Sequence, residues 1–392
     1  MKKIITRNLD INIHHGKSFF LWGPRKVGKT YWIKNYFFPQ LAGQKIQAEY
    51  IDFLLTDQLI LYTQRPGLLR ERYASFNGVI VIDEIQKVPS LLDEVHWMIE
   101  NTKVIFILTG SSARKLKKGH ANMLGGRAWR RVMNPLSLTE ISEYDIEGVL
   151  SSGLLPSHYL SDNPVEELRS YVADYLKEEI IAEALVTNIP NFSNFLNVVA
   201  ITNSELLNYT NVASESGVSA KVVRSYFDIL EDTHLGFRIP PWTKARERRM
   251  ILTEKFYLFD VGVANYLAKR IVRQGTPEFG KAFEHLVLME IKAYQAYKNP
   301  ELDIYFWRTS SGKEVDLILG NGTVALEIKG KTTVHEKDIK SFIDLSEEIK
   351  VKHKIVVSLE THARSLQSGP LKGVKILPLK SFIEQLWSGD LL

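Results

Sequence analysis

The chain has 392 residues, 45% of them hydrophobic and 24% charged, so two or three domains with substantial cores are expected. It has no cysteine, which excludes disulfides, thiolate metal sites and cysteine nucleophiles and fits a reducing compartment. The formal net charge of +5 is a mild basic bias over this length. No apolar run is long enough to cross a bilayer and the start lacks an apolar signal core, so we expect a cytoplasmic protein with no membrane partner.

The first third of the chain alternates short apolar runs with amphipathic stretches, which predicts a parallel α/β sheet with crossover helices. A helical pattern then extends to about residue 267, and a smaller α/β unit follows a connector that contains Gly275 and Pro277. The expected strands of the first unit are 19–22, 49–53, 78–82 and 104–108. The expected domains are 1–163, 164–270 and 271–392.

Residues 23–30 have the spacing of a Walker A motif and lie between a predicted strand and a predicted helix. The glycines permit a loop whose backbone amides surround an anion, and the helix N-terminus adds its positive dipole end. Lys29 is expected to reach the β- and γ-phosphates and Thr30 to place a hydroxyl on Mg²⁺. For this motif alone, a chance glycine-rich turn is the alternative. The predicted ATP-binding residues of this loop are Gly23, Pro24, Arg25, Lys26, Val27, Gly28, Lys29 and Thr30.

A second motif makes that alternative negligible, because the apolar run 79–82 ends in Asp83 and Glu84. Asp83 is placed to hold the water shell of Mg²⁺, and Glu84 is the candidate catalytic base for the attacking water. The next predicted strand, 104–108, is followed by Thr109 and Ser111, either of which is a candidate γ-phosphate sensor, although a plain turn fits there nearly as well. The two motifs together predict ATP hydrolysis with ATP and Mg²⁺ as cofactors.

An arginine is also expected to stabilise the transition state, either in cis or from a neighbouring subunit of a homo-oligomer. Arg127 follows two glycines, which let a backbone approach closely, and it is the preferred finger. A solvated basic face is an equally good interpretation of this basic stretch. The arginines of the stretch are Arg114, Arg127, Arg130 and Arg131.

The segment 206–230 has the form of a helix-turn-helix, with Gly217 in the turn and Ser219 as the N-cap of the second helix. An inward apolar stripe is predicted at Val222, Tyr226, Ile229 and Leu230. Such a stripe leaves Lys221, Arg224 and Ser225 facing outward, where they would meet base edges or phosphates of DNA. A basic stretch with Arg246, Arg248 and Arg249 resembles a wing. A lid or protein contact is the alternative role.

In the last unit Asn321 and Gly322 predict a two-residue hairpin loop. This register places Asp316 opposite Glu327, with Lys329 on the same face; Val315, Leu317 and Leu319 face the other way. Two opposed carboxylates repel, and a divalent cation would compensate them. Lys329 is then placed to steady a nucleophilic water or a scissile phosphate, and Glu284, on an apolar helix face, is a candidate third metal ligand. The alternatives are simple pairing of the acids with Lys329 and a binding site without cleavage.

Over nearly its whole length the chain resembles the bacterial and archaeal AAA-type ATPases that carry a C-terminal domain of restriction-nuclease fold and unknown function. The resemblance implies a P-loop NTPase α/β domain, a helical and winged-helix middle domain, and a nuclease-like α/β domain. It also implies that Asp316 with 327–329 matches the metal signature of that nuclease superfamily, Glu284 being its helix acid. The blocks that carry the resemblance are 23–30, 81–86, 108–114, 134–136, 175–180, 230–233, 240–242, 256–262, 283–285, 307–308 and 314–316.

Two functions fit these predictions. The first is an ATP-driven enzyme that binds and processes DNA. The second is a regulatory switch in which ATP turnover changes a partner-binding surface and the nuclease-like unit only docks.

Overall fold

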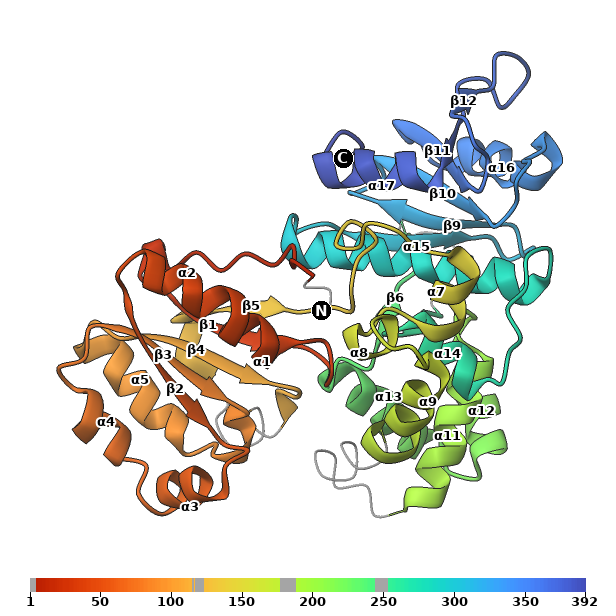
Figure 1. Ribbon diagram of the computed structural model, residues 1–392. Coiled ribbons are helices and arrows are strands. Elements are labelled where there is room, and N and C mark those ends of the chain that lie inside the picture. The colour runs from red at the N-terminus through yellow and green to blue at the C-terminus, as the bar shows by residue number, and fades with distance from the viewer. Residues whose placement is uncertain (1–4, 115, 117–122, 177–187, 244–252) are drawn as a thin grey trace.

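The computed structural model describes residues 5–114, 116, 123–176, 188–243 and 253–392. Figure 1 shows an N-terminal α/β part, a mostly helical middle part, and a C-terminal α/β part that lies across the middle part. No helix within these described ranges is long and apolar enough to cross a membrane. The order of the three parts is the one that the sequence patterns predict.

The N-terminal sheet has five parallel strands in the order β2-β3-β4-β1-β5. Four of them confirm the predicted strands to within two residues. The fifth, β5, was not predicted, because Arg130 and Arg131 interrupt its apolar pattern. The strands are β1 (Ser18–Trp22), β2 (Gln47–Asp52), β3 (Gly78–Asp83), β4 (Ile105–Gly110) and β5 (Ala128–Val132).

Helices cover both faces of this sheet, because side chains alternate along buried strands. Val79 and Val81 of β3 face one core, and Ile80 and Ile82 face the other. Helices α1 (Lys29–Trp32) and α2 (Phe38–Gly43) contribute to the first core. Helices α3 (Thr56–Gln64), α4 (Leu68–Tyr73) and α5 (Leu91–Asn101) contribute to the second. Because the five strands are parallel, their carboxyl ends lie together at one edge of the sheet.

The middle part is built on the predicted helix-turn-helix. Gly217 ends α12 with a φ of 67°, and the Ser219 side chain caps α13 by accepting a hydrogen bond from the Val222 N–H. Val223 and Phe227 are buried as well as the predicted Tyr226, and Val222 is only half-buried. The helices are α7 (Ile146–Ser152), α8 (Pro156–Tyr159), α9 (Pro164–Ser170), α11 (Ile189–Ile201), α12 (Tyr209–Ser216), α13 (Ala220–Asp232) and α14 (Val261–Leu267).

An antiparallel pair of strands, β6 (Gly236–Ile239) and β7 (Lys255–Leu258), follows the helix-turn-helix. The basic stretch with Arg246, Arg248 and Arg249 lies outside the described residues. Helix α7 lies before the predicted boundary at residue 163, yet it packs against α14 of the middle part.

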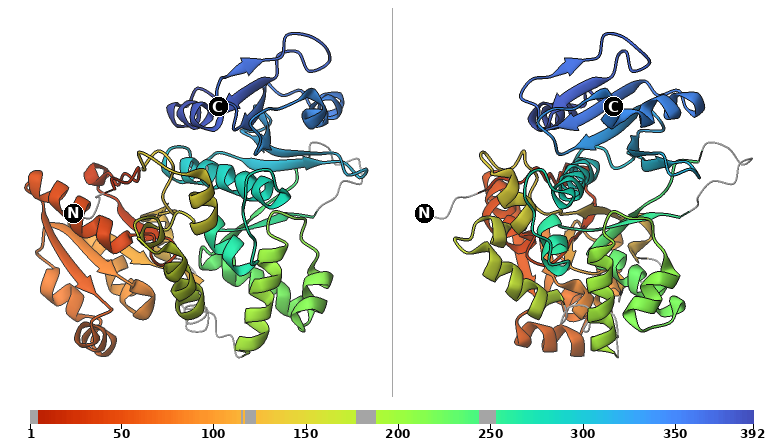
Figure 2. Two further views of the ribbon diagram at one scale, coloured as in Figure 1. Left: turned by 45° about the vertical axis from the view of Figure 1, so that its right-hand side comes forward. Right: turned by 90° about the vertical axis from the view of Figure 1, so that its right-hand side faces the viewer.

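The C-terminal part has a mixed sheet in the order β12-β13-β11-β10-β9-β8. Helices α15 (Pro277–Tyr297) and α17 (Leu379–Ser388) share a core on one face, and α16 (Ser341–Glu348) packs on the other. Both views in Figure 2 show α15 between this sheet and the rest of the chain. The strands are β8 (Ile304–Arg308), β9 (Glu314–Leu319), β10 (Val324–Lys329), β11 (His353–Ser358), β12 (Arg364–Ser365) and β13 (Lys375–Pro378).

The predicted hairpin register between β9 and β10 is confirmed. Asn321 and Gly322 have φ values of 52° and 85°, as a tight hairpin turn requires, and Leu317 pairs with Leu326. One prediction about the faces is wrong: Val315 packs in the core that contains α16, not with Leu317 in the core that contains α15. The adjoining pairing of β8 with β9 is irregular, and such an irregularity interrupts strict alternation.

Candidate active site

Residues 23–30 leave the carboxyl end of β1 and enter α1, as predicted. The loop has positive φ at Gly23 (149°), Lys26 (62°) and Gly28 (95°). A Cβ on Gly23 would lie 2.4 Å from the Met133 carbonyl oxygen, so only glycine fits there. The buried Lys29 donates from Nζ to the carbonyls of Gly23 and Pro24, at 2.6 and 2.9 Å. The loop and its lysine therefore have the arrangement that a phosphate site needs.

Asp83 is the centre of a hydroxyl cluster at the carboxyl end of β3. Its Oδ2 accepts a hydrogen bond from Thr30 Oγ1 at 2.7 Å and another from the Tyr50 hydroxyl, and its Oδ1 accepts one from Thr109. These residues meet because β2, β3, β4 and β1 lie side by side in this order, with their carboxyl ends at one edge. A threonine hydroxyl beside a carboxylate fits Mg²⁺ in a P-loop site, where the ion lies beside the phosphates.

Glu84 lies next to this cluster in a left-handed conformation with a φ of 61°, which costs a non-glycine residue about 1 kcal/mol or more. Its N–H donates to Thr109 Oγ1 at 3.3 Å, and its carboxylate accepts a hydrogen bond from Gln86 Nε2. The same Gln86 nitrogen lies 3.3 Å from Ser111 Oγ at the end of β4. Gln86 therefore orients the carboxylate and is itself held by Ser111 from the segment after β4, as a base that positions water requires.

Two residues that the sequence motifs missed hold this site in place. Burial and the Asp83 carboxylate raise the pKa of Tyr50, so its hydroxyl remains a donor. Arg7 donates to the Val27 carbonyl of the loop and to the Asn134 carbonyl after β5, both at 2.6 Å, and its Nε lies 3.0 Å from Glu140. Neither residue belongs to a local motif, and only the tertiary contacts reveal their positions.

Arg127 was predicted to act as a finger in cis or from a neighbouring subunit, and its position does not allow the first arrangement. In the parallel register β5 begins beside Ser18, at the amino end of β1, whereas the phosphate loop follows Trp22 at the carboxyl end. Arg127 precedes β5 and is paired there with Glu100 at 2.5 Å. It is therefore at the opposite edge of the sheet from Lys29, so a role for Arg127 on ATP requires a neighbouring subunit.

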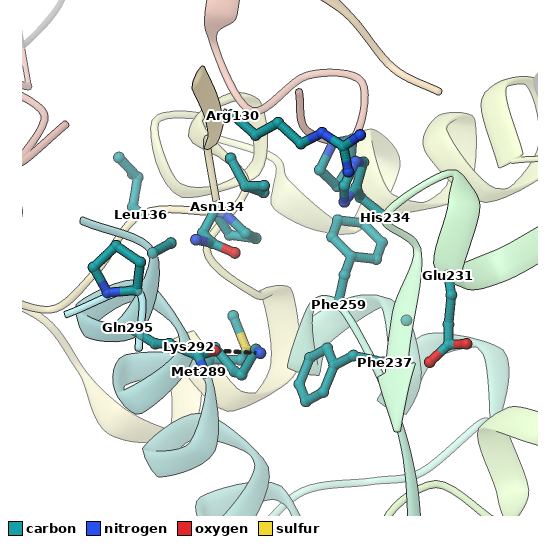
Figure 3. A pocket seen from close by; sticks show the side chains of 16 residues that line it. Arg130, Asn134, Leu136, Glu231, His234, Phe237, Phe259, Met289, Lys292 and Gln295 are labelled. Carbon is teal, nitrogen blue, oxygen red and sulfur yellow. Dashed lines mark hydrogen bonds between the residues drawn. The ribbon is translucent and has the colours of Figure 1, made fainter. Parts of the chain in front are cut away.

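A cavity of about 410 Å³ touches all three parts of the chain (Figure 3). Pro24 of the phosphate loop lines it together with Phe237 of β6 and Lys292 of α15. Lys292 donates to Gln295 Oε1 at 2.5 Å, and its Nζ lies 5.2 Å from the centre of the Phe237 ring. Burial lowers the pKa of Lys292 to about 8. The cavity thus brings a cation of the C-terminal part to a space that the phosphate loop also borders.

In the C-terminal part, the confirmed register brings Asp316 and Glu327 to one sheet face with Lys329 beside them. Lys329 Nζ lies 3.6 Å from Asp316 and also contacts Glu327. Burial alone would lower the pKa of Lys329, but the two carboxylates raise it. Asp316 also accepts the N–H of Ile328 at 2.6 Å. The lysine thus provides the compensation for which a metal ion was predicted.

Glu284 is held by partners from β7. It accepts a hydrogen bond from the Tyr257 hydroxyl at 2.6 Å, and Lys255 Nζ of β7 lies 3.6 Å away. Lys255 also contacts Glu314 at 2.5 Å and is only 3% exposed. Within the described ranges, no group of three or more acidic or histidine side chains is positioned to hold a metal ion. The predicted set of Glu284, Asp316 and Glu327 is therefore not formed as a metal site, and no cleavage step follows from it.

The outward face of α13 agrees with the prediction. Lys221, Arg224 and Ser225 are exposed. The Arg224 guanidinium lies 5.1 Å from the ring centre of Tyr209, and Asp228 on the same helix is paired with Arg238 at 3.0 Å. The basic stretch with Arg246, Arg248 and Arg249 lies outside the described residues.

Comparisons with known protein families match three segments of the chain. Residues 15–142 match the family described as AAA domain, and this match includes the phosphate loop, Asp83 and Glu84. Residues 144–273 and 279–382 match two domains of unknown function, DUF8612 and DUF4143. The match and the geometry of the loop show an AAA-type ATPase domain, whose general activity is nucleotide binding and hydrolysis.

Individual relatives are distant. An uncharacterized protein of Methanocaldococcus jannaschii, MJ1544, is 21% identical over 383 residues, which cover 89% of this chain and 83% of the relative. The genome packaging NTPase B204 of Sulfolobus turreted icosahedral virus 2, solved with AMPPCP, is 18% identical with a TM-score of 0.23, over 32% of this chain and 78% of that chain. Domain III of the Thermotoga maritima replication initiation protein DnaA is 14% identical with a TM-score of 0.25, over 56% and 86% of the two chains. Similarity this low carries no conclusion about substrate or partner.

Proposed function

We propose that this chain binds MgATP in the loop of residues 23–30 and hydrolyses it to drive a conformational change in its middle part. The observation that carries the proposal is the convergence of Thr30 and Asp83, whose oxygens lie 2.7 Å apart at the end of the phosphate loop. Thr30 and Asp83 would hold Mg²⁺, which supplies charge stabilisation to the phosphates when it is bound. Lys29 neutralises phosphate charge and Glu84 positions the attacking water. Thr109 acts with them as the γ-phosphate sensor, and Arg127 reaches the nucleotide of a neighbouring subunit in a homo-oligomer.

Calorimetric titration with MgATP tests the binding step. Lys29→Ala should abolish measurable binding, because the phosphates lose their nearest cation. Lys17→Ala is the matched control, since Lys17 is exposed and precedes β1 at the opposite edge of the sheet. Equal ATP affinity in the two variants would contradict the assignment of the site.

A second candidate function is DNA binding by the helix-turn-helix, favoured by the exposed Lys221 and Arg224 on α13. Binding to duplex DNA should weaken steeply as salt is added, because phosphate contacts release counterions. Failure of the protein to bind any duplex or single strand at about 50 mM salt would leave α13 as a lid or protein contact.

For the C-terminal part we propose that, in the conformation described, it binds a partner without cleaving nucleic acid. Nuclease activity is the alternative. The contacts of Lys329 with Asp316 and Glu327 support docking. If a divalent cation displaces Lys329, Mg²⁺ or Mn²⁺ should raise the thermal midpoint of the protein, and Asp316→Asn should remove that increment. Cleavage of linear, flapped or four-way DNA that depends on the cation and is lost in Lys329→Ala would establish the alternative.

A further inference from the structure

We propose that Arg114 contacts the γ-phosphate of ATP bound to the same chain, and that Asp232 of α13 holds Arg114 when no γ-phosphate is present. This inference rests on the proposed function, because it assigns a residue that contacts the γ-phosphate of the same bound ATP. It makes α13, the second helix of the helix-turn-helix, the element that responds to ATP.

The position of Arg114 follows from the sheet. Strand β4 ends at Gly110, which pairs with Trp22, and the phosphate loop begins at the residue after Trp22. A Cβ on Gly110 would lie 2.4 Å from Gln86 Oε1, so the end of β4 is packed directly against the residue that orients Glu84. Arg114 follows four residues later, at the same edge as the loop. Arg114 therefore lies at the carboxyl edge of the sheet, whereas Arg127 lies at the opposite edge.

The Arg114 guanidinium is paired with one carboxylate, but not all of its hydrogen-bond donors are used within the described residues. Nη1 lies 3.1 Å from Asp232 Oδ2, and the two side chains are 17% and 22% exposed. Nε is buried and has no hydrogen-bond partner among the described residues. A guanidinium presents several donors in a fixed plane and binds phosphate oxygens in a bidentate manner. Arg114 therefore has donors available for an oxyanion close to a strand end where phosphates are expected.

Asp232 is the last residue of α13, so its pairing with Arg114 ties the end of this helix to the nucleotide edge of the sheet. A γ-phosphate would compete with the Asp232 carboxylate for the same guanidinium. ADP lacks the competing group and leaves the pair intact. Because coupling is reciprocal, weakening the pair should strengthen ATP binding, and ATP should weaken the hold on α13.

The test compares dissociation constants for MgATP and MgADP by calorimetry. Arg114→Gln should weaken ATP binding by about ten-fold or more, the effect of a lost charge-assisted hydrogen bond, and should change ADP binding by less than about two-fold. Asp232→Asn should tighten ATP binding by up to about five-fold, the range of a partly exposed ion pair, and should leave ADP unchanged. Asp228→Asn is the matched control, because Asp228 lies on the same helix but pairs with Arg238.

Arg114→Lys provides a second variant that keeps the positive charge and should hydrolyse ATP at a rate between those of the wild type and Arg114→Gln. An unchanged ratio of ATP to ADP affinity in a folded Arg114→Gln protein would overturn the proposal. An Asp232→Asn protein that behaves like Asp228→Asn would overturn the role of the helix. Absence of ATP binding by the wild type would instead contradict the proposed function itself.

Discussion

Glu290 on α15 provides the strongest test of the electrostatics of the fold. Its side chain is only 1% exposed. Oε1 accepts the Leu138 N–H at 2.7 Å, and Oε2 meets no donor in hydrogen-bonding geometry within the described part of the chain. Burial raises the pKa of this carboxyl to about 8, and the Leu138 contact offsets only part of the shift. The folded protein therefore retains a proton that an exposed glutamate would lose.

The sign of the pH dependence follows from this difference. Between about pH 4.3, the ordinary glutamate pKa, and about pH 8, the unfolded chain releases a proton that the folded chain keeps. Stability should therefore fall as pH rises through this window and level off above it. At about 1.4 kcal/mol for each pKa unit, the free energy of unfolding should fall by an amount on the order of 3–5 kcal/mol across this window because of Glu290.

Glu290→Gln should remove this dependence, because glutamine is neutral at every pH and keeps the acceptor for the Leu138 N–H. Urea unfolding at about pH 5 and about pH 8.5 should show little change from the wild type at the lower pH and a gain of several kcal/mol at the higher pH. Glu384→Gln is the control, since Glu384 is exposed on the adjoining α17. If Glu290→Gln and the wild type lose stability equally as pH rises, the carboxyl is not buried as described.

Other predictions test the remaining contacts. Lys255→Met should destabilise the protein by about 3–5 kcal/mol in urea unfolding, because it leaves Glu284 without its buried cation; a change near zero would mean that the pair is hydrated. Arg127→Ala and Glu84→Gln should each hydrolyse ATP poorly alone, yet a mixture of the two should recover turnover if the arginine acts on a neighbouring subunit; no recovery would exclude that role. Replacing Lys221 and Arg224 by glutamine should flatten the salt dependence of any DNA binding, and an unchanged slope would remove α13 from the interface.

Local patterns predicted the parts of this molecule that depend on local chemistry. Glycine spacing located the phosphate loop, because positive φ at Gly23 and Gly28 is a backbone requirement. Asn321 and Gly322 predicted the hairpin register and so placed Asp316 opposite Glu327. An apolar run that ends in Asp83 located the acidic end of β3, because a strand buried on both faces carries its charges at its end.

The sequence failed where a role depends on contacts between distant segments. Arg127 follows two glycines and looked suited to approach a nucleotide, but the direction of β5 places it at the wrong edge for its own chain. Glu284 was predicted as a third metal ligand because its cation was not visible: Lys255 comes from the middle part. Arg7 joins the loop to the segment after β5, and no pattern near residue 7 predicts this.

Phosphate release by the purified protein tests most directly whether Asp83 and Glu84 support the hydrolysis of bound MgATP. The wild type should release phosphate from ATP only with Mg²⁺ present. Glu84→Gln should bind ATP as the wild type does and release phosphate at least about 100-fold more slowly, the upper range for a lost general base. A Glu84→Gln protein that turns over at the wild-type rate, or a wild-type protein that binds MgATP without releasing phosphate, would contradict the account.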